Sequence, residues 1–170
     1  MWVKVALCEL RCCSSGEIQT VFRGVNQVNL DAKGRLAIPA RYRDQISVQC
    51  SGHMVLTIDT EERCLLLYPI DDWEEIQEKV NALPSFNPAA RRLQRLLIGH
   101  ATDLDMDGNG RLLIPSLLRE YAGLDKKVIL LGQGRKFELW DEAAWNETRE
   151  EYLQIDDASG NFDGLQDLSL

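Results

Sequence analysis

The sequence predicts an α+β fold made of two copies of one small unit, and three observations support this prediction. The stretch from Asn29 to Pro39 recurs as Asp105 to Pro115. In each copy, strand-like and helix-like patterns of apolar residues surround this stretch. Each copy spans about 55 residues, which is marginal for an independent core, so the copies are expected to pack on each other or on another chain.

The repeat keeps the same residue types at the same spacing. The shared positions are Asp31, Gly34, Arg35, Leu36, Ile38 and Pro39 in the first copy, and Asp107, Gly110, Arg111, Leu112, Ile114 and Pro115 in the second. Aspartate can hydrogen-bond the backbone two residues further on, and glycine tolerates positive φ. We therefore predict a tight turn at 31–34 and another at 107–110. Such a repeat sets the architecture before any residue is assigned a role.

In the first copy, each predicted element follows from a local pattern. Pro39 suits the first turn of a helix, and polar residues 60–63 between two apolar runs are typical of a β-hairpin loop. Asp71 and Glu74 have the spacing of a capping box at the start of an amphipathic helix. The predicted elements are strands at 25–30 and 35–38, a helix at 40–46, hairpin strands at 54–59 and 64–68, and a helix from residue 71 to about 83.

A linker helix is predicted between the copies, because Asn87 can cap a helix whose first position is Pro88. It extends to about Ile98. The second copy repeats the plan of the first, and Asp141 opens its last helix. Its other predicted elements are a strand at 111–114, a short helix to about 121, and hairpin strands at 128–131 and 137–140 around Gly132, Gln133 and Gly134. The acidic sequence that follows is typical of a disordered tail.

Composition argues against several classes of protein. The five cysteines are odd in number and show no C-x-x-C spacing, so they predict neither a disulfide framework nor a zinc site. Free thiols are typical of a reducing cytoplasm. No apolar run reaches about 18 residues, so we expect no transmembrane helix and no membrane partner.

Neither a metal site nor a catalytic constellation is predicted. Asp103, Asp105 and Asp107 resemble the start of a calcium-binding loop, but position twelve of that loop is Ile114, which lacks the required carboxylate. A turn accounts for this stretch without a metal. The two histidines have no partner at a fixed spacing, and the chain has no nucleophile elbow or phosphate-binding loop. We therefore expect no enzyme and no cofactor.

The charge is unevenly distributed along the chain, whose net charge is −8. Residues 138–170 are acidic, with Arg149 as their only base, whereas residues 23–43 form a basic patch. This patch contains Arg23, Lys33, Arg35, Arg41 and Arg43 against Asp31 alone. The negative net charge argues against binding to nucleic acid, but a local basic patch is typical of a surface that binds phosphate groups. A solvated basic surface is the alternative.

The two copies differ in charge, and the difference indicates which copy binds a partner. Arg35 and Arg43 recur as Arg111 and Arg119, but the other bases of the patch are replaced by Gly99, Asn109 and Leu117. If the second copy is purely structural, the first carries an additional electrostatic role. Phosphate is the obvious partner, because each lysine or arginine contact releases counterions.

The shared aspartate–arginine pair has a structural and a functional interpretation. Asp31 can cap the turn and form an ion pair with Arg35. Arginine is also the side chain that reads guanine edges and phosphates bidentately. Both interpretations can hold for Arg35. For the second motif, formed by Asp107, Gly110 and Arg111, we prefer the structural interpretation.

Further motifs accompany the repeat between residue 21 and residue 170. They are Phe22-Arg-Gly24, Asn29-Leu-Asp31-x-Lys-Gly-Arg35-Leu, Pro39-x-Arg41-Tyr-Arg43, Leu65-Leu-Leu-Tyr-Pro69, Asn87-Pro88, Arg91-Arg92-x-Gln-Arg95 and Gly110-Arg-Leu. Together they closely resemble the MraZ family, bacterial regulators at the head of the division-and-cell-wall gene cluster. The resemblance implies two tandem AbrB-like swapped-hairpin β-barrel units, packed as one pseudo-symmetric domain with flanking helices.

The resemblance also implies a function. It indicates a ring-shaped homo-oligomer that binds short direct repeats in its own promoter as a repressor, in the cytoplasm and associated with the nucleoid. The family ties the first aspartate–arginine motif to DNA, which implies DNA contacts at Asp31 and Arg35. The basic patch independently indicates the same copy, so we expect Lys33, Arg41, Arg43 and Arg23 to contribute. A ring-forming scaffold that does not bind DNA is the alternative.

The expected domain boundaries follow from the repeat and the resemblance. They are an N-terminal extension at 1–20, the DNA-contacting repeat at 21–86, the linker helix at 87–98, the structural repeat at 99–153 and the acidic tail at 154–170. Val21 stands where the family's initiator methionine would be, and the valine codon GUG can initiate bacterial translation. We therefore hypothesise that residues 1–20 come from an upstream start site and are not native.

Overall fold

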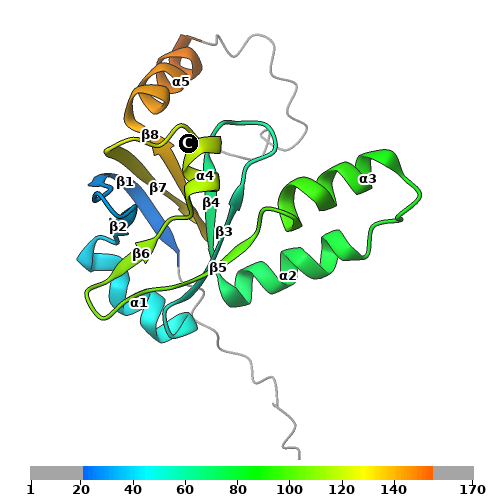
Figure 1. Ribbon diagram of the computed structural model, residues 1–170, viewed down its shortest axis with the longest axis horizontal. Coiled ribbons are helices and arrows are strands. Elements are labelled where there is room, and N and C mark those ends of the chain that lie inside the picture. Colours follow the sequence, from blue (N-terminus) through cyan, green and yellow to red (C-terminus); the bar gives the residue numbers. More distant parts are fainter. Residues whose placement is uncertain (1–20, 155–170) are drawn as a thin grey trace, which may run out of the picture.

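One antiparallel sheet combines strands from both copies (Figure 1). The computed structural model describes residues 21–154. Six strands follow the order β1–β7–β8–β4–β3–β5, and β2 and β6 form a separate two-stranded ribbon. The strands are β1 (Phe22–Asn29), β2 (Arg35–Ala37), β3 (His53–Ile58), β4 (Leu65–Pro69), β5 (Thr102–Asp105), β6 (Arg111–Leu113), β7 (Lys127–Gly134) and β8 (Lys136–Asp141). The predicted α+β class is confirmed.

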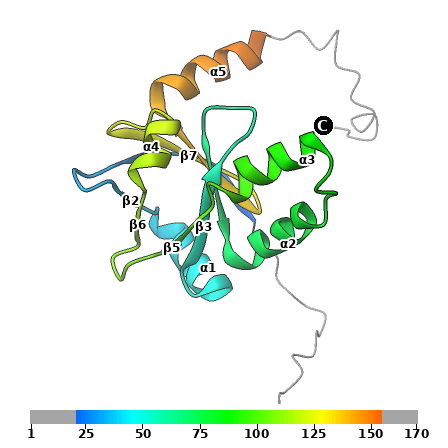
Figure 2. The same ribbon diagram turned by 45° about the vertical axis from the view of Figure 1, so that its right-hand side comes forward.

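The helices surround this sheet. They are α1 (Ala40–Cys50), α2 (Ile70–Asn81), α3 (Pro88–Leu93), the π-helical turn η1 (Gln94–Ile98), α4 (Ser116–Tyr121) and α5 (Glu142–Gln154). Figures 1 and 2 show α2 and α3 lying side by side as an arm that extends away from the sheet. Asn87 caps α3 as predicted, because its side chain accepts a hydrogen bond from the backbone N–H of Ala89 at 2.8 Å.

Strands of the two copies pair with each other throughout the fold. The first strand of copy one, β1, pairs along its whole length with β7 of copy two, from Phe22 opposite Gly134 to Asn29 opposite Lys127. In the same way β5 of copy two pairs with β3 of copy one. The ribbon also joins the copies, with Leu36 opposite Leu112. Each copy therefore completes the sheet of the other.

The ribbon is anchored by apolar side chains that alternate along its strands. Leu36 and Leu112 are fully buried in the main core. Successive residues of a strand point to opposite faces, so their neighbours in each strand must face outward. Ile38 and Ile114, which follow the ribbon strands, are buried as well. The core thus determines which face of the ribbon meets solvent.

Several sequence-based boundaries are wrong. Helix α1 continues to Cys50, because Tyr42, Ile46 and Cys50 bury one helical face and a left-handed residue, Ser51, ends the helix. The hairpin of the second copy turns between Gln133 and Lys136, so that Gly132 to Gly134 belong to β7 and not to the loop. The positive φ of Gly134, 74°, allows this tight reversal.

Two helix predictions also need correction. Helix α2 begins at Ile70, one residue before the predicted cap, and no side chain caps it. Asp71 lies inside the first turn, so the predicted capping box is absent. The linker helix changes at Leu93 from an α-helix to the π-helical turn η1. Strand β5 (Thr102–Asp105) was not predicted, because its apolar content is low.

Two predicted regions fall outside the described residues. These are the N-terminal extension at 1–20 and the tail from residue 155, whereas Gln154 is the last residue of α5. Within residues 21–154, no helix has the length and apolar character needed to cross a membrane.

Candidate nucleic-acid interface

The first turn is organised by the carboxylate of Asp31. Its Oδ1 accepts hydrogen bonds from the backbone N–H of Lys33 at 2.8 Å and of Arg35 at 3.0 Å. Its Oδ2 accepts a hydrogen bond from Nε of Arg35 at 2.7 Å. The backbone closes the turn as well, because the N–H of Gly34 donates to the Asp31 carbonyl at 2.9 Å. One carboxylate therefore shapes the turn and orients a guanidinium.

The second turn has the same geometry. Oδ1 of Asp107 accepts from the backbone N–H of Asn109 and of Arg111, both at 2.9 Å. Nε of Arg111 donates to Oδ2 of Asp107 at 2.9 Å, and Gly110 closes the turn through the Asp107 carbonyl at 2.8 Å. Asp107 is the last carboxylate of the stretch that resembles a calcium-binding loop, and both of its oxygens accept hydrogen bonds within the turn. Within residues 21–154, no cluster of three or more histidine, cysteine or acidic residues forms a metal site.

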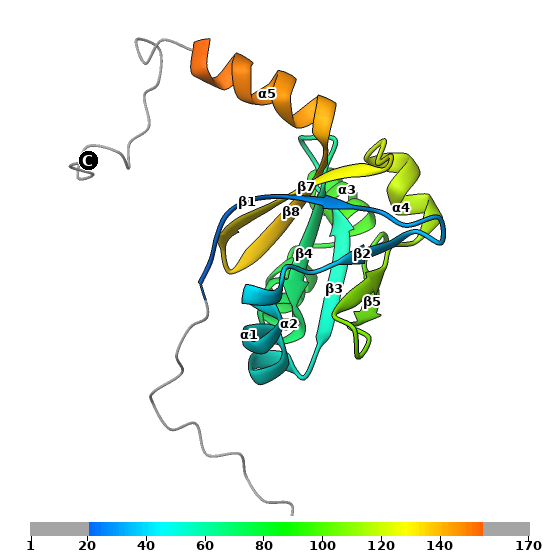
Figure 3. The same ribbon diagram turned by 90° about the vertical axis from the view of Figure 1, so that its left-hand side faces the viewer.

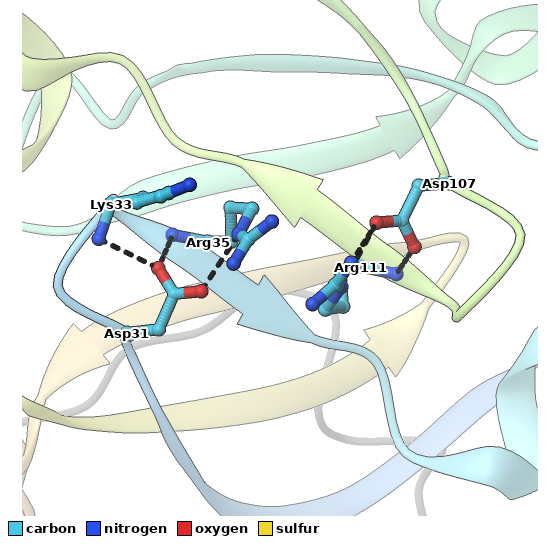
Figure 4. Close-up of polar contacts among 5 residues, drawn as sticks. All are labelled: Asp31, Lys33, Arg35, Asp107 and Arg111. Atoms are coloured by element: carbon cyan, nitrogen blue, oxygen red, sulfur yellow. Dashed lines mark hydrogen bonds and ion pairs between the residues drawn. The ribbon is translucent and has the colours of Figure 1, made fainter.

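Both arginines lie on the outward face of the ribbon (Figure 4). Arg35 is paired with Leu113 across the ribbon, and Arg111 is paired with Ala37. These four residues therefore share the face opposite the buried leucines. The two arginine side chains have almost equal exposed fractions, 31% for Arg35 and 32% for Arg111. The ribbon presents two similarly oriented guanidinium groups on one solvent-facing surface.

The hydrogen bonds keep both aspartates ionised. The Arg35 backbone N–H, its side chain and the Lys33 N–H lower the pKa of Asp31 to about 2, from an ordinary value of 3.8. The side-chain hydrogen bond from Arg111, followed by the backbone bonds, lowers the pKa of Asp107. Each aspartate therefore stays ionised well below neutral pH, and its hydrogen bond with the arginine Nε orients the guanidinium.

Lys33 distinguishes the two turns. Its backbone N–H bonds to Asp31, while its side chain is exposed and forms no ion pair within the described residues. Asn109 occupies the equivalent place in the second turn and brings no charge. The first turn therefore carries one more positive charge than the second. This charge lies next to Arg35, which its aspartate holds in the same way as Asp107 holds Arg111.

Arg41 and Arg23 lie together at a different place, where α1 meets the start of β1. Nη2 of Arg41 donates to Oδ1 of Asn26 and to the hydroxyl of Tyr42, both at 2.6 Å. The Tyr42 hydroxyl donates to the backbone carbonyl of Arg23 at 2.6 Å. The Arg41 guanidinium also lies 4.6 Å from the centre of the Tyr42 ring. These contacts hold Arg41 against β1, beside the exposed Arg23.

Arg43 lies beside the second turn. Its Nε donates to the carbonyl of Ile38 at 2.7 Å, and its guanidinium covers Gly110. The six residues predicted to contact DNA thus occupy three places. Asp31, Lys33 and Arg35 form the first turn (Figure 4), which joins β1 to β2 (Figure 3). Arg23 and Arg41 lie at the start of β1, and Arg43 lies against the other copy.

Comparison with known proteins agrees with this architecture. The family model described as "MraZ protein, putative antitoxin-like" matches the chain twice, at residues 21–96 and 97–162. The chain belongs to the MraZ family. A transcriptional regulator MraZ from Halorhodospira halophila is 61% identical over 134 residues, which cover 79% of this chain and 88% of the relative.

A second relative aligns over its whole length. The transcriptional regulator MraZ of Alkalilimnicola ehrlichii is 55% identical over 150 residues, which cover 88% of this chain and all of the relative. The transcriptional regulator MraZ of Pseudomonas putida strain W619 is 54% identical over 151 residues, again 88% of this chain and all of the relative. The resemblance to the MraZ family that the sequence motifs indicate is therefore confirmed.

Two relationships at this surface do not follow from the sequence. The β2–β6 ribbon places Arg111 of the second copy beside Arg35 of the first. In addition, Arg119 of the second copy covers Gly34 of the first turn. Leu36 and Leu112 are equivalent in the repeat and are both buried, but this equivalence does not by itself specify that their strands pair.

Proposed function

We propose that this protein is a sequence-specific DNA-binding transcriptional regulator that represses its own division-and-cell-wall operon, in the cytoplasm at the nucleoid. The observation that carries the proposal is the outward-facing ribbon with its pre-oriented Arg35. Relatives of this chain are named transcriptional regulators, which supports the same class. No enzymatic activity and no cofactor form part of the proposal.

The ribbon supports a specific mode of contact. The major groove of B-form DNA admits a two-stranded β-ribbon, and arginine is the side chain that most often reads guanine there. Asp31 holds Nε of Arg35 at 2.7 Å and leaves the tip of the guanidinium directed outward. Arg35 reads a base edge, and Lys33 contacts a neighbouring phosphate. Asp31 itself acts by orienting Arg35.

The remaining basic residues have secondary roles in this proposal. Arg41 and Arg23 lie near each other at the start of β1, where they extend the positive surface along the DNA backbone. The second motif keeps a structural role, because Asp107 and Gly110 build the turn that delivers β6 to the ribbon. Arg111 adds positive charge beside Arg35 without being the chief reader.

We also propose that residues 21–86 and 99–153 are two AbrB-like swapped-hairpin units, joined by the linker at 87–98. The pairing of β1 with β7, β5 with β3 and β2 with β6 supports an exchange of strands between the units. In this arrangement the units form one pseudo-symmetric barrel-like domain. The first unit contacts DNA and the second contributes to assembly.

A ring-shaped homo-oligomer completes the proposal. A single turn with two or three basic residues gives a modest affinity, and the whole chain has a net charge of −8. Several subunits on one ring would engage several short direct repeats at once, so that weak contacts add through a high effective concentration. The acidic C-terminal sequence disfavours non-specific DNA by repulsion.

An electrophoretic shift of promoter DNA tests this function. The probe is a fragment of the cluster's own promoter with its direct repeats, and the control is the same fragment with the repeats scrambled. We expect a shift of the first fragment only, with an affinity that falls as salt rises. Equal shifts of both fragments would show non-specific binding and overturn the proposed sequence specificity. The absence of any shift would favour the ring-forming scaffold that does not bind DNA. A promoter–reporter fusion then tests repression. If the protein is a repressor, deletion of its gene should raise expression of the reporter.

A further inference from the structure

Arg119 of α4 packs against the first turn, although it belongs to the second copy. Its Nε donates to the carbonyl of Ile114 at 3.1 Å. Its guanidinium lies directly over Gly34, where a methyl group on the glycine would come within 2.8 Å of Cζ of Arg119. The N–H of Ile114 donates to the carbonyl of Gly34 at 2.9 Å. Two neighbouring contacts from the second copy therefore converge on one glycine of the first.

The same arrangement recurs with the copies exchanged. Nε of Arg43 donates to the carbonyl of Ile38 at 2.7 Å, and the N–H of Ile38 donates to the carbonyl of Gly110 at 2.8 Å. A methyl group on Gly110 would come within 2.8 Å of Cζ of Arg43. Each turn is therefore covered by an arginine and held by a backbone hydrogen bond from the opposite copy.

We propose that Arg119 is a positioning residue for the DNA-contacting turn, and that Arg43 has the matching role for the second turn. The part of this inference that concerns DNA rests on the function proposed above. Arg119 acts through Gly34, which lies between Lys33 and Arg35. Arg43, predicted from the sequence as a DNA contact, positions the Asp107–Arg111 turn.

The chemistry of both partners fits this role. Gly34 and Gly110 have φ angles of 79° and 72°, a region that residues with a side chain rarely adopt. A bare Cα also lets a flat guanidinium approach the turn closely. Arginine suits this place better than lysine, because a planar group covers the turn while Nε donates to the neighbouring strand. The contact therefore fixes the turn relative to the ribbon.

Positioning matters because a binding side chain works only when its support holds it in place. Asp31 sets the local shape of the first turn, and hence the direction of Arg35 within it. Asp31 does not set where that turn lies relative to β6. The contacts of Arg119 and Ile114 with Gly34 supply this second constraint. The register of β2 and β6 sets the spacing of Arg35 and Arg111, and the two constraints hold the first turn in place beside them.

Residue-resolved hydrogen–deuterium exchange tests the positioning directly on the full-length protein. In Arg119→Ala, we expect exchange of the Gly34 and Ile114 amides to accelerate by about tenfold, because local opening becomes easier. In the matched variant Arg43→Ala, the Gly110 and Ile38 amides should accelerate instead. Acceleration of both pairs by either variant, or of neither pair, would overturn the proposal.

A milder variant separates positioning from charge. Arg119→Lys keeps the positive charge and much of the side chain but lacks the planar group and Nε. We expect this variant to fold, to show faster exchange at Gly34 and Ile114, and to bind the promoter fragment about tenfold more weakly than the unmodified protein. Exchange and affinity equal to those of the unmodified protein would show that charge alone matters and would refute the positioning role.

The readouts also separate this inference from the proposed function. If the two amide pairs respond selectively but the unmodified protein does not shift the promoter fragment, the positioning contacts stand and the DNA-binding function fails. If the unmodified protein shifts the fragment and Arg119→Lys shifts it equally well at unchanged oligomer size, the function stands and the positioning role fails.

Discussion

Arg35 and Arg111 lie diagonally across the β2–β6 ribbon, because Arg111 is paired with Ala37 and Arg35 with Leu113. Both side chains face solvent, and each is held by the aspartate that opens its own turn. Two motifs that are far apart in the sequence thus form one surface. Their proposed contributions to DNA binding can be compared directly, since the two residues differ mainly in their neighbours Lys33 and Asn109.

We predict that Arg35→Ala abolishes promoter binding, while Arg111→Ala weakens it to a smaller extent. Loss of one bidentate arginine contact costs about 1–3 kcal/mol per site, and the proposed ring would repeat that loss in every subunit. Gel shift gives the affinity, and size-exclusion chromatography with light scattering checks that the oligomer persists. Normal binding by Arg35→Ala at unchanged oligomer size would refute the site.

The second prediction concerns Lys33, whose exposed side chain is proposed to contact a phosphate. In Lys33→Asn, which copies the second turn into the first, affinity should fall and the slope of log K against log salt should become shallower by about 0.9 per site. The reciprocal variant Asn109→Lys should steepen the slope. An unchanged slope in Lys33→Asn would rule out a phosphate contact for this residue.

The third prediction concerns the ionisation of Asp31. The folded-state pKa, about 2, lies below the ordinary 3.8, so the carboxylate stabilises the turn fully above pH 3.8 and loses this effect as pH falls toward 2. NMR titration of the Asp31 carboxyl carbon should place its midpoint near 2. In Arg35→Ala the midpoint should rise only part of the way, because the backbone N–H groups still donate.

A matched control keeps that titration interpretable. Arg111→Ala should raise the pKa of Asp107, whose depression depends first on the Arg111 side chain, and should leave the Asp31 midpoint in place. A midpoint for Asp31 near 3.8 in the unmodified protein would contradict the hydrogen-bonded turn.

The fourth prediction contrasts two helix starts. Asn87 caps α3 through a 2.8 Å hydrogen bond to the N–H of Ala89, so Asn87→Ala should lower the free energy of unfolding by about 1 kcal/mol. Asp71 makes no capping contact in α2, and Asp71→Ala should change it by less than about 0.5 kcal/mol. Urea unfolding at one fixed protein concentration measures both values. Equal losses would indicate that Asp71 caps α2 after all.

Local patterns in the sequence predict the two turns and the cap at Asn87, because hydrogen bonds between near neighbours determine them. Apolar runs between turn residues predict most of the strands, although not the partners with which they pair. The start of α2 was wrong by one residue, since Pro69 allows the helix to begin at Ile70 without a side-chain cap. Periodicity also placed Gly132 and Gly134 in a loop, although β1 lies so close to Gly132 that a methyl group would meet the Arg23 backbone at 2.8 Å. That close approach depends on a partner strand distant in the sequence.

The same reason explains what was missed at the candidate site. The sequence predicts that the basic patch of the first copy is one surface, because its residues are near in sequence. Arg43 instead reaches the turn at Gly110, and Arg119 reaches Gly34. Only the pairing of β2 with β6 brings these partners together, and strand pairing between copies leaves no mark in the spacing of either copy.

The pairing of β1 with β7 has a consequence for biosynthesis. Phe22 must find Gly134, roughly one hundred residues later, and a ribosome adds about 5–20 residues per second. The first strand therefore leaves the ribosome roughly 5–20 seconds before its partner strand does. Until then its backbone donors and acceptors have no strand to pair with. Translation speed across the second copy sets how long this nascent edge remains open to other chains.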